Sequence, residues 1–191
     1  MDTQSPPSNL LETERLILRP LEARDAPGLL ALYSLPEVTA YIDTPVMTQI
    51  ADAEGWIARQ ADMQRSGAGL RWGVFDRESG DLIGSCGFHH WDPTRYRAEI
   101  SYDLSPRFWG QGYMREALLS VLAFGFEQMG IHRIEAMVDP DDTRSQNLLY
   151  GLGFEMEGIL RDHDYLKGRF QDDMMFALLE QEWKITHLAY R

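Results

Sequence analysis

The sequence predicts an α+β (mixed α/β) fold: a single domain with a largely antiparallel sheet and flanking helices. Short runs of alternating apolar residues, separated by turn residues, indicate strands, and segments with apolar residues at helical spacing interrupt them. The chain has 191 residues, 44% of them apolar, which is enough for a core without disulfides or metal. We expect a loose tail at residues 1–10, which show no hydrophobic period, and one domain over residues 11–185.

The N-terminal half predicts one strand, two helices and a three-stranded meander. Pro20 ends the first strand, Asp25 is placed to cap the first helix, and residues 78–80 form a hairpin turn within the meander. The expected elements are a strand at 15–19, a helix after Asp25, a helix at 50–65, and strands at 70–76, 81–90 and 97–104.

The C-terminal half begins with the strongest helical pattern in the chain, over residues 113–129, which Gly130 ends. A strand at 133–138 follows, and then a short helix at 143–152 that ends at Gly153. Two closing strands at 154–165 and 170–179 are joined by a turn at Lys167 and Gly168. This brings the expected sheet to seven strands.

The charge of the chain argues against one class of partner. Thirty acidic side chains against 18 basic ones give a net charge of −12. Such a field repels a phosphate backbone, whose binding depends on Lys and Arg contacts, so nucleic acid is not expected as a partner. Cationic molecules such as protonated amines are attracted instead.

Cysteine usage and hydropathy point to the cytoplasm. Cys86 is the only cysteine, and the polar start of the chain has no secretory leader. The longest apolar stretch, residues 117–126, is much shorter than the roughly 18 residues that cross a bilayer, so no membrane contact is expected. Cys86 lies inside the apolar run 82–88, where a buried and inert thiol is expected.

A glycine-rich segment between the strand at 97–104 and the helix at 113–129 has the character of an anion site. Gly110 and Gly112 remove Cβ atoms where a ligand would touch the backbone. The free N–H groups and the positive end of the following helix suit a pyrophosphate, and Arg107 adds a positive charge. Taken alone, the two glycines are equally consistent with a flexible turn.

The segment Arg107-x-x-Gly110-x-Gly112 resembles the acetyl-CoA signature Q/R-x-x-G-x-G/A of the GNAT N-acetyltransferase superfamily. A second segment, from Asp142 and Ser145 to Leu152-Gly153-Phe154, is similar to the pattern N-x-x-S followed by L-G-F. That pattern marks the RimJ/RimL branch, the ribosomal-protein N-terminal acetyltransferases. The likeness covers residues 11–183, with the elements in family order.

This resemblance implies the GNAT acyl-CoA N-acyltransferase fold, whose sheet is splayed between the strands at 97–104 and 133–138 with pantetheine in the gap. It implies acetyl-CoA as co-substrate. The residues expected to bind the coenzyme are Leu104, Arg107, Trp109, Gly110, Gln111, Gly112, Tyr113, Met114 and Asp142.

Two positions depart from the family pattern. Asp142 stands where the family has asparagine, and an aspartate just before a helix is typical of an N-cap. The tyrosine that many members use to protonate the leaving thiolate corresponds to Leu149, and Tyr150 would face about 100° away. By resemblance to the RimJ/RimL branch we assign Ser145 the general-acid or thiolate-stabilising role, against the alternative of an ordinary first-turn serine.

Glu99 is the candidate general base. Side chains alternate along its strand, so Glu99, Ser101 and Asp103 share the face opposite to Ala98 and Ile100. Glutamate in this strand resembles the frequent base of the superfamily. The alternatives are a solvated carboxylate paired with a neighbouring arginine, or a base among Asp162, Asp164 and Asp173.

His89, His90 and Trp91 are expected to border the acceptor-amine pocket, because they follow a strand that leads into the family's cleft; plain turn residues are the alternative. No metal is expected, since adjacent histidines on a strand point to opposite faces and no spaced ligand pair completes a site.

The expected function is direct transfer of acetyl from acetyl-CoA to a primary amine, foremost a protein N-terminal α-amine. The alternatives are acetylation of a small amine (amino acid, polyamine or aminoglycoside) and a non-catalytic module that senses acetyl-CoA. A homodimer is expected because family members often pair through their sheets or C-terminal strands.

Overall fold

The computed structural model describes residues 9–188, so residues 1–8 of the expected tail lie outside the described part. The helical elements are η1 (Ala23–Asp25), α1 (Ala26–Tyr33), α2 (Ile50–Arg65), η2 (Pro106–Phe108), α3 (Tyr113–Glu127), α4 (Thr143–Gly151) and α5 (Glu180–Leu188). The strands are β1 (Leu11–Glu12), β2 (Leu16–Arg19), β3 (Leu70–Asp76), β4 (Leu82–Asp92), β5 (Arg97–Leu104), β6 (Arg133–Val138), β7 (Glu155–Leu166) and β8 (Arg169–Leu179).

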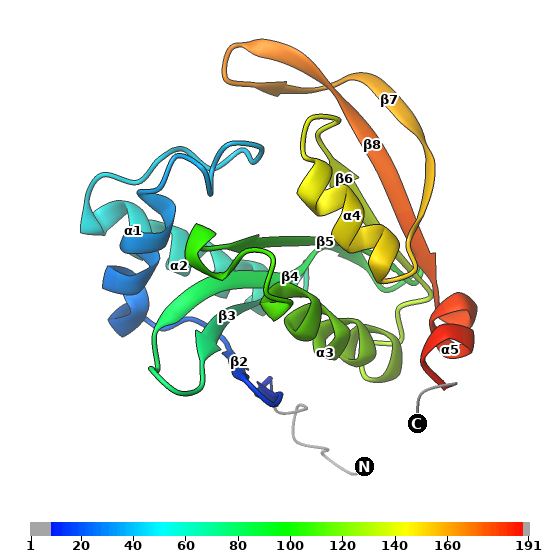
Figure 1. Cartoon of the computed structure of the whole chain (residues 1–191), viewed down its shortest axis with the longest axis horizontal. Coiled ribbons are helices and arrows are strands. Elements are labelled where there is room, and N and C mark those ends of the chain that lie inside the picture. Colours follow the sequence, from blue (N-terminus) through cyan, green and yellow to red (C-terminus); the bar gives the residue numbers. More distant parts are fainter. Residues whose placement is uncertain (1–8, 189–191) are drawn as a thin grey trace.

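The eight strands form one sheet in the order β1-β2-β3-β4-β5-β6-β8-β7 (Figure 1). The first five strands form an antiparallel meander, and β6, β8 and β7 form a second antiparallel group. A parallel pairing between β5 and β6 joins the two groups. The expected mixed, mostly antiparallel sheet is confirmed.

Besides the short 3-10 helices η1 and η2, one strand and one helix were not predicted. The eighth strand is β1, where Leu11 pairs with Leu18 and Glu12 with Ile17. Two residues are too short to show an alternating pattern, so only the pairing reveals this strand. The helix α5 continues directly from β8, and its Trp183 stacks on Phe126 of α3 with ring centroids 5.7 Å apart.

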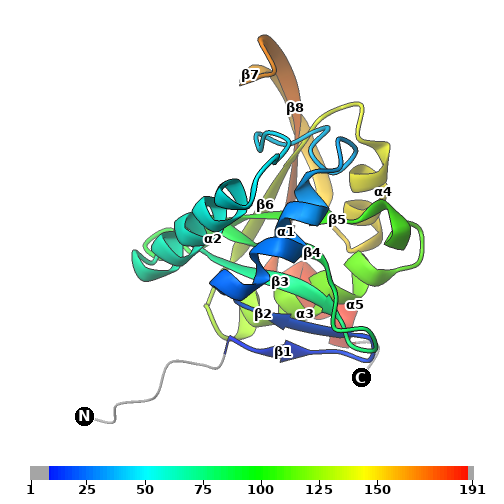
Figure 2. The same ribbon diagram turned by 90° about the vertical axis from the view of Figure 1, so that its left-hand side faces the viewer.

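The helices cover both faces of the sheet (Figure 2). On one face α3 packs against the main core, where Phe124 lies edge-on to Trp72 at 5.4 Å. On the other face α1 and α2 enclose a second core around Tyr33 and Trp56. Each large apolar side chain that is fully buried in this way contributes about 1.5–3 kcal/mol to folding. Within residues 9–188, no helix combines the length and apolarity needed to cross a membrane.

The β7–β8 hairpin arches away from the core, and its tip returns to the loop between α1 and α2 (Figure 1). Lys167 lies at the tip and donates from Nζ to the backbone oxygens of Thr39 (2.9 Å) and Ala40 (2.5 Å). The hairpin and this loop therefore meet across the face on which α1 and α2 lie.

Candidate active site

The ladder between β5 and β6 spans only three residue pairs. Arg97–Glu99 of β5 pairs with Arg133–Glu135 of β6, and beyond them the strands separate. The splayed sheet expected from the family resemblance is therefore present. Two cavities lie along the separated part of β5, one toward the start of α3 and one toward α1 and α2.

Two glycines with left-handed backbone shape the segment between β5 and α3. Gly110 has a φ of 71°, and Gly112, the N-cap of α3, has a φ of 80°. A Cβ built on Gly110 would have no atom within 4 Å, and one on Gly112 would have only Arg15 Nη2, at 3.6 Å. A ligand can therefore approach this backbone closely, and the N-terminus of α3 favours a negatively charged one.

Arg15, which precedes β2, contacts the segment between β5 and α3. Its Nε donates to Glu116 Oε2 (2.6 Å), its Nη1 donates to Gln111 O (3.1 Å), and its guanidinium lies 4.1 Å from the centre of the Tyr113 ring. Thr13 Oγ1 donates to the same carboxylate (2.5 Å). The loop is thus held by side chains that the sequence analysis did not single out.

The first cavity, of about 440 Å³, lies against this segment. Seven of the nine residues expected to bind coenzyme line it: Leu104, Trp109, Gly110, Gly112, Tyr113, Met114 and Asp142. Arg107 and Gln111 do not line the cavity; both are exposed, and Gln111 Nε2 donates to Arg107 O (2.7 Å). The cationic side chains on its lining are instead those of Arg115 and Arg144. The guanidinium of Arg144 lies 3.7 Å from the centre of the Trp109 ring.

The second cavity, of about 620 Å³, is lined by His89 and His90, which were predicted to border an acceptor pocket, and by Glu99, the predicted base. Trp91 is not part of its lining, because this side chain is half-buried and packs against the main core. Of the alternative bases, Asp164 and Asp173 line the cavity, whereas Asp162 is exposed and lies outside the lining.

Glu99 is enclosed by two histidines. His89 Nε2 lies 3.0 Å from Glu99 Oε1, and His90 Nδ1 lies 3.2 Å from Glu99 Oε2. Burial of the carboxylate favours its neutral form, but hydrogen bonds to the two histidines, together with their charge when protonated, outweigh this effect and lower the pKa of Glu99. Glu99 is therefore an ionised acceptor of protons at neutral pH. The alternative pairing with Arg95 or Arg97 is not observed.

The expectation that His89 and His90 point to opposite faces is wrong. His90 has a φ of 50°, and the register between β4 and β5 shifts between His89 and Asp92. This irregularity turns both rings toward the same carboxylate, with centroids 4.8 Å apart. The distances to Glu99 are those of hydrogen bonds, and we assign these side chains to proton sharing. The sequence contains no signal for a positive φ at a histidine.

The two cavities meet at a set of residues that line both: Tyr41, Ile42, Tyr102, Asp103, Asp142 and Ser145. Asp142 is the N-cap of α4, as its sequence position suggests: its Oδ1 accepts from the backbone N–H of Ser145 (3.1 Å). Its Oδ2 accepts from the Ser145 hydroxyl (2.7 Å). The proton of Ser145 therefore points to Asp142 in this conformation, whereas an asparagine with its oxygen on the Ser145 N–H would present an NH2 donor to the hydroxyl.

Tyr102 is a further hydroxyl at this junction that was not predicted. It is on the apolar face of β5, and its phenol donates to the backbone oxygen of Ser145 (3.3 Å). Burial raises the pKa of Tyr102, so the phenol keeps its proton. By contrast Leu149 is fully buried, and Tyr150 is half exposed with its ring against Phe176, as the helical spacing indicates. Tyr102 differs from an ordinary core residue because β5 and β6 separate beside it and leave it on the lining of both cavities.

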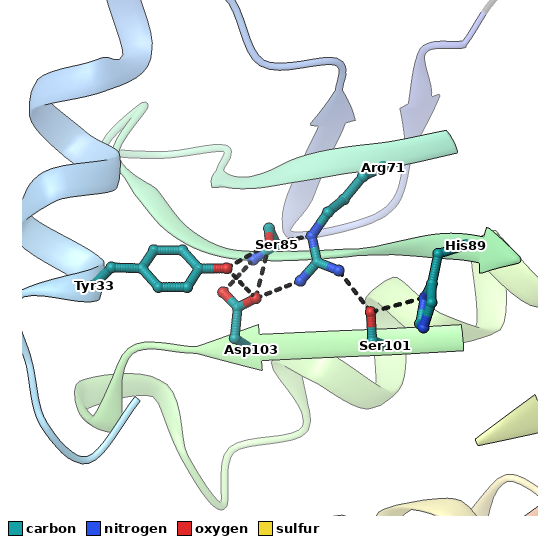
Figure 3. Close-up of polar contacts among 6 residues, drawn as sticks. All are labelled: Tyr33, Arg71, Ser85, His89, Ser101 and Asp103. Carbon is teal, nitrogen blue, oxygen red and sulfur yellow. Dashed lines mark hydrogen bonds and ion pairs between the residues drawn. The ribbon is translucent and has the colours of Figure 1, made fainter. Parts of the chain in front are cut away.

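Behind Glu99, the same face of β5 carries a buried polar cluster (Figure 3). Asp103 accepts from Tyr33 Oη (2.7 Å), Ser85 Oγ (2.8 Å) and Arg71 Nη2 (2.5 Å). Arg71 Nη1 also donates to Ser101 Oγ (2.7 Å). Much of the polar face of β5 is thus covered by α1 and α2, and its residues Glu99, Ser101 and Asp103 also line the second cavity. Cys86 is fully buried, and burial raises the pKa of its thiol to about 12, which makes it inert.

Comparison with known proteins agrees with this geometry. A family profile described as an acetyltransferase (GNAT) domain matches residues 15–155. The chain is 40% identical to the N-acetyltransferase p20 of Bacillus licheniformis over 173 residues, covering 91% of this chain and 97% of that protein. It is 30% identical to the [ribosomal protein uS5]-alanine N-acetyltransferase of Escherichia coli over 182 residues, covering 93% and 94%.

Among solved structures, a GCN5-related N-acetyltransferase from Brucella melitensis superposes with a TM-score of 0.86 at 26% identity, covering 97% of this chain and 85% of that one.

Proposed function

We propose, from the premise that this chain belongs to the GNAT acetyltransferase family, that it acetylates the N-terminal α-amine of a protein of the ribosomal type. Acetyl-CoA is the acetyl donor in this family. The observation that carries the proposal is the meeting of two cavities at Tyr102, Asp142 and Ser145. The E. coli relative, whose printed name gives a ribosomal-protein alanine as its substrate, supports the acceptor class.

The residues of the first cavity fit the coenzyme. Gly110 and Gly112 leave the backbone open to a pyrophosphate, and the N-terminus of α3 together with Arg144 supplies positive charge. Beyond Glu99 the backbone of β5 lacks a partner strand on its β6 side, which suits the amides of pantetheine.

Glu99 would take a proton from the acceptor ammonium, directly or through one water. An α-amine with a pKa of about 8 is roughly 10% neutral at pH 7, whereas a lysine amine at about 10.4 is roughly 0.04% neutral. A carboxylate of lowered pKa is therefore matched to α-amines rather than to lysine side chains. Holding both substrates in adjoining cavities supplies a further part of the rate.

The neutral amine attacks the thioester carbonyl; a C–N bond forms, and the C–S bond breaks as the tetrahedral intermediate collapses. The departing thiolate takes up one proton, and the nitrogen of the intermediate gives up the one proton that it carries in excess of the amide product, so that the step balances. Ser145 and Tyr102 both carry a hydroxyl at the junction, and Ser145 would release its bond to Asp142 to reach the sulfur. The proton that Glu99 accepted leaves through the second cavity.

Because the Ser145 hydroxyl is committed to Asp142, a second function is a module that binds acetyl-CoA without transfer. Thiol release from acetyl-CoA separates the two. The purified protein is tested with peptides beginning with Ala, Ser or Met, with free amino acids, with polyamines and with aminoglycosides, while calorimetry measures coenzyme binding. We expect release with the peptides. Thiol release only with small amines would show that the acceptor is a small amine instead of a protein N-terminus. Coenzyme binding without any thiol release would favour the module that binds acetyl-CoA without transfer.

The substitution Glu99→Gln tests the base. We expect kcat/KM for the best acceptor to fall about 10²- to 10⁴-fold, while the affinity for acetyl-CoA stays unchanged, because the carboxylate lines only the acceptor cavity. An unchanged kcat/KM would assign the proton transfer to Asp164, to Asp173 or to water alone.

Two further expectations accompany this function. A cytoplasmic setting fits a ribosomal-protein acceptor and a single buried thiol. A homodimer rests on the pairing habits of the family, and sedimentation of the purified chain would test it.

A further inference from the structure

A line of hydrogen bonds runs from the buried cluster on the polar face of β5 to His89 (Figure 3), which in turn contacts Glu99. Arg71 lies at its buried end, where Nε donates to Ser85 Oγ (2.8 Å) and Nη2 to Asp103 Oδ2 (2.5 Å). Its side chain is 12% exposed. These contacts fix the guanidinium, so that the remaining nitrogen, Nη1, is aimed at Ser101 Oγ at 2.7 Å.

The direction of each bond in this line follows from the chemistry of the groups. A guanidinium has only donors, so Ser101 Oγ must be the acceptor from Arg71. The hydroxyl then has its own proton to place. Within the described residues its other partner is His89 Nδ1 at 3.4 Å. The serine proton has a partner when Ser101 donates to Nδ1, in which case Nδ1 carries a lone pair.

A neutral imidazole with an unprotonated Nδ1 has its proton on Nε2. His89 Nε2 is the atom that lies 3.0 Å from Glu99 Oε1. A carboxylate oxygen accepts from an N–H but repels a ring nitrogen lone pair. The other tautomer would place a lone pair against Glu99, and it would leave the Ser101 proton without an acceptor among the described residues.

We propose that Arg71 and Ser101 are positioning residues, which select the Nε2–H tautomer of His89 and so make His89 a fixed hydrogen-bond donor to Oε1 of Glu99. The consequence for the reaction rests on the proposed function, in which Glu99 is the base. With Oε1 occupied by a donor, the acceptor's proton is directed to Oε2. That oxygen faces His90, whose side chain is 78% exposed and can yield its place.

The tautomer is measured directly by long-range proton–nitrogen NMR on the full chain with ¹⁵N-labelled histidine, at a pH where His89 is neutral. The spectrum of His89→Gln identifies the His89 signals by their loss. We expect His89 to show an unprotonated Nδ1 and a protonated Nε2. A protonated Nδ1 with an unprotonated Nε2 in the unmodified chain overturns the proposal without any variant being needed.

Ser101→Thr and Ser101→Val form a matched pair, because both are β-branched and suit a strand, but only threonine keeps the hydroxyl. We expect the threonine variant to keep the Nε2–H pattern and the valine variant to show a mixture of tautomers. His163, whose Nδ1 lies 2.8 Å from Asp173 Oδ2 outside this line, is the internal control and should be unchanged in both. An unchanged His89 pattern in a folded valine variant also overturns the proposal.

Kinetics give the second readout once an acceptor is known. The valine variant should lower kcat about tenfold and leave the KM for acetyl-CoA unchanged, and the threonine variant should restore kcat. Equal kcat in both variants would remove the link to catalysis. The NMR result is independent of turnover, so a chain that transfers no acetyl group would refute the proposed function while the tautomer was still decided.

Discussion

At the scale of single residues, Glu99 shows how one carboxylate is adapted by its neighbours. Burial alone would raise its pKa, but His89 and His90 reverse the sign and keep it ionised below the usual range of a glutamate. In the native state this ionisation contributes stability above the unfolded pKa of the group and loses it as pH falls toward the folded value. A change in activity near pH 8 or above therefore does not come from Glu99, and we assign it to the acceptor amine.

We accordingly predict that kcat/KM rises with pH up to the pKa of the acceptor and then levels. Raising the pH deprotonates the ammonium, whereas Glu99 is already ionised and adds nothing further. A peptide α-amine should give a limb near pH 8, and a free lysine side-chain amine, if accepted, one near pH 10.4. Initial rates across pH with the two acceptors test this. If kcat/KM rose at the same pH with both acceptors, the titrating group would belong to the protein and not to the acceptor.

Gly112 is a second residue for which backbone geometry determines the outcome of a substitution. Gly112→Val would place a branched side chain at a φ of 80°, in front of the proposed pyrophosphate site. We expect loss of acetyl-CoA binding in calorimetry, together with a stability loss of about 1–2 kcal/mol from the left-handed backbone.

A matched variant separates these two effects. Gly67 has a φ of 72°, has no atom within 4 Å of a built Cβ, and lies at the end of α2, outside the lining of both cavities. Gly67→Val should therefore show a similar loss of stability in urea titrations and bind acetyl-CoA normally. Normal binding by the Gly112 variant would remove the coenzyme site from this segment.

At the scale of elements, the β7–β8 hairpin is joined to the α1–α2 loop beside the second cavity by Lys167. Lys167 Nζ binds two backbone oxygens of the α1–α2 loop, which also supplies Tyr41 and Ile42 to both cavities. A hydrogen bond from a charged donor at a partly exposed site contributes about 1 kcal/mol. The contact therefore sets how firmly the hairpin holds the loop that walls the site.

Lys167→Met keeps the length of this side chain and removes its donors. We expect faster amide hydrogen exchange at residues 36–49 and 162–171, and a KM for peptide acceptors changed about fivefold, with the KM for acetyl-CoA changed less. Lys184, the only other lysine, pairs with Glu180 on α5 and lines neither cavity, so Lys184→Met is the control. Equal exchange in the two variants would show that the contact does not hold the loop.

The elements also show how far sequence reasoning reaches. The helix Ile50–Arg65 and the strand Arg133–Val138 were predicted to the residue, because their periodic patterns are long or sharply bounded. β1 was missed because a two-residue strand has no pattern. The same limit applies to the site. The glycines of the coenzyme segment can be recognised in the sequence, but the positive φ of His90 has no sequence signal. The Arg71–Asp103 and Tyr102–Ser145 contacts join residues far apart in the chain, so no local pattern predicts them.

At the scale of the whole molecule, the net charge of −12 governs encounter rather than chemistry. A peptide with a protonated α-amine and basic neighbours is drawn in by the field, and salt weakens this attraction. The Debye length falls from about 30 Å at 0.01 M to about 8 Å at 0.15 M ionic strength.

We predict that raising ionic strength over this range lowers kcat/KM for a basic acceptor peptide and raises it for an acidic peptide with the same first residue. Stopped-flow or steady-state rates at low substrate concentration test this, with kcat at saturation as the control that should not move. The same salt response for both peptides would mean that local contacts, not the overall field, control the approach.

The three rungs between β5 and β6 have a mechanical consequence. Each half of the sheet is stiffened by full-length antiparallel ladders, but the seam between the halves is short and lies at one end of the opening. We expect the two halves of the sheet to rotate relative to each other about these three residue pairs. A small rotation would change the width of the opening between β5 and β6 at Tyr102 without deforming either half. We therefore expect the width of the opening at Tyr102 to depend on this short ladder as well as on the side chains that line the opening.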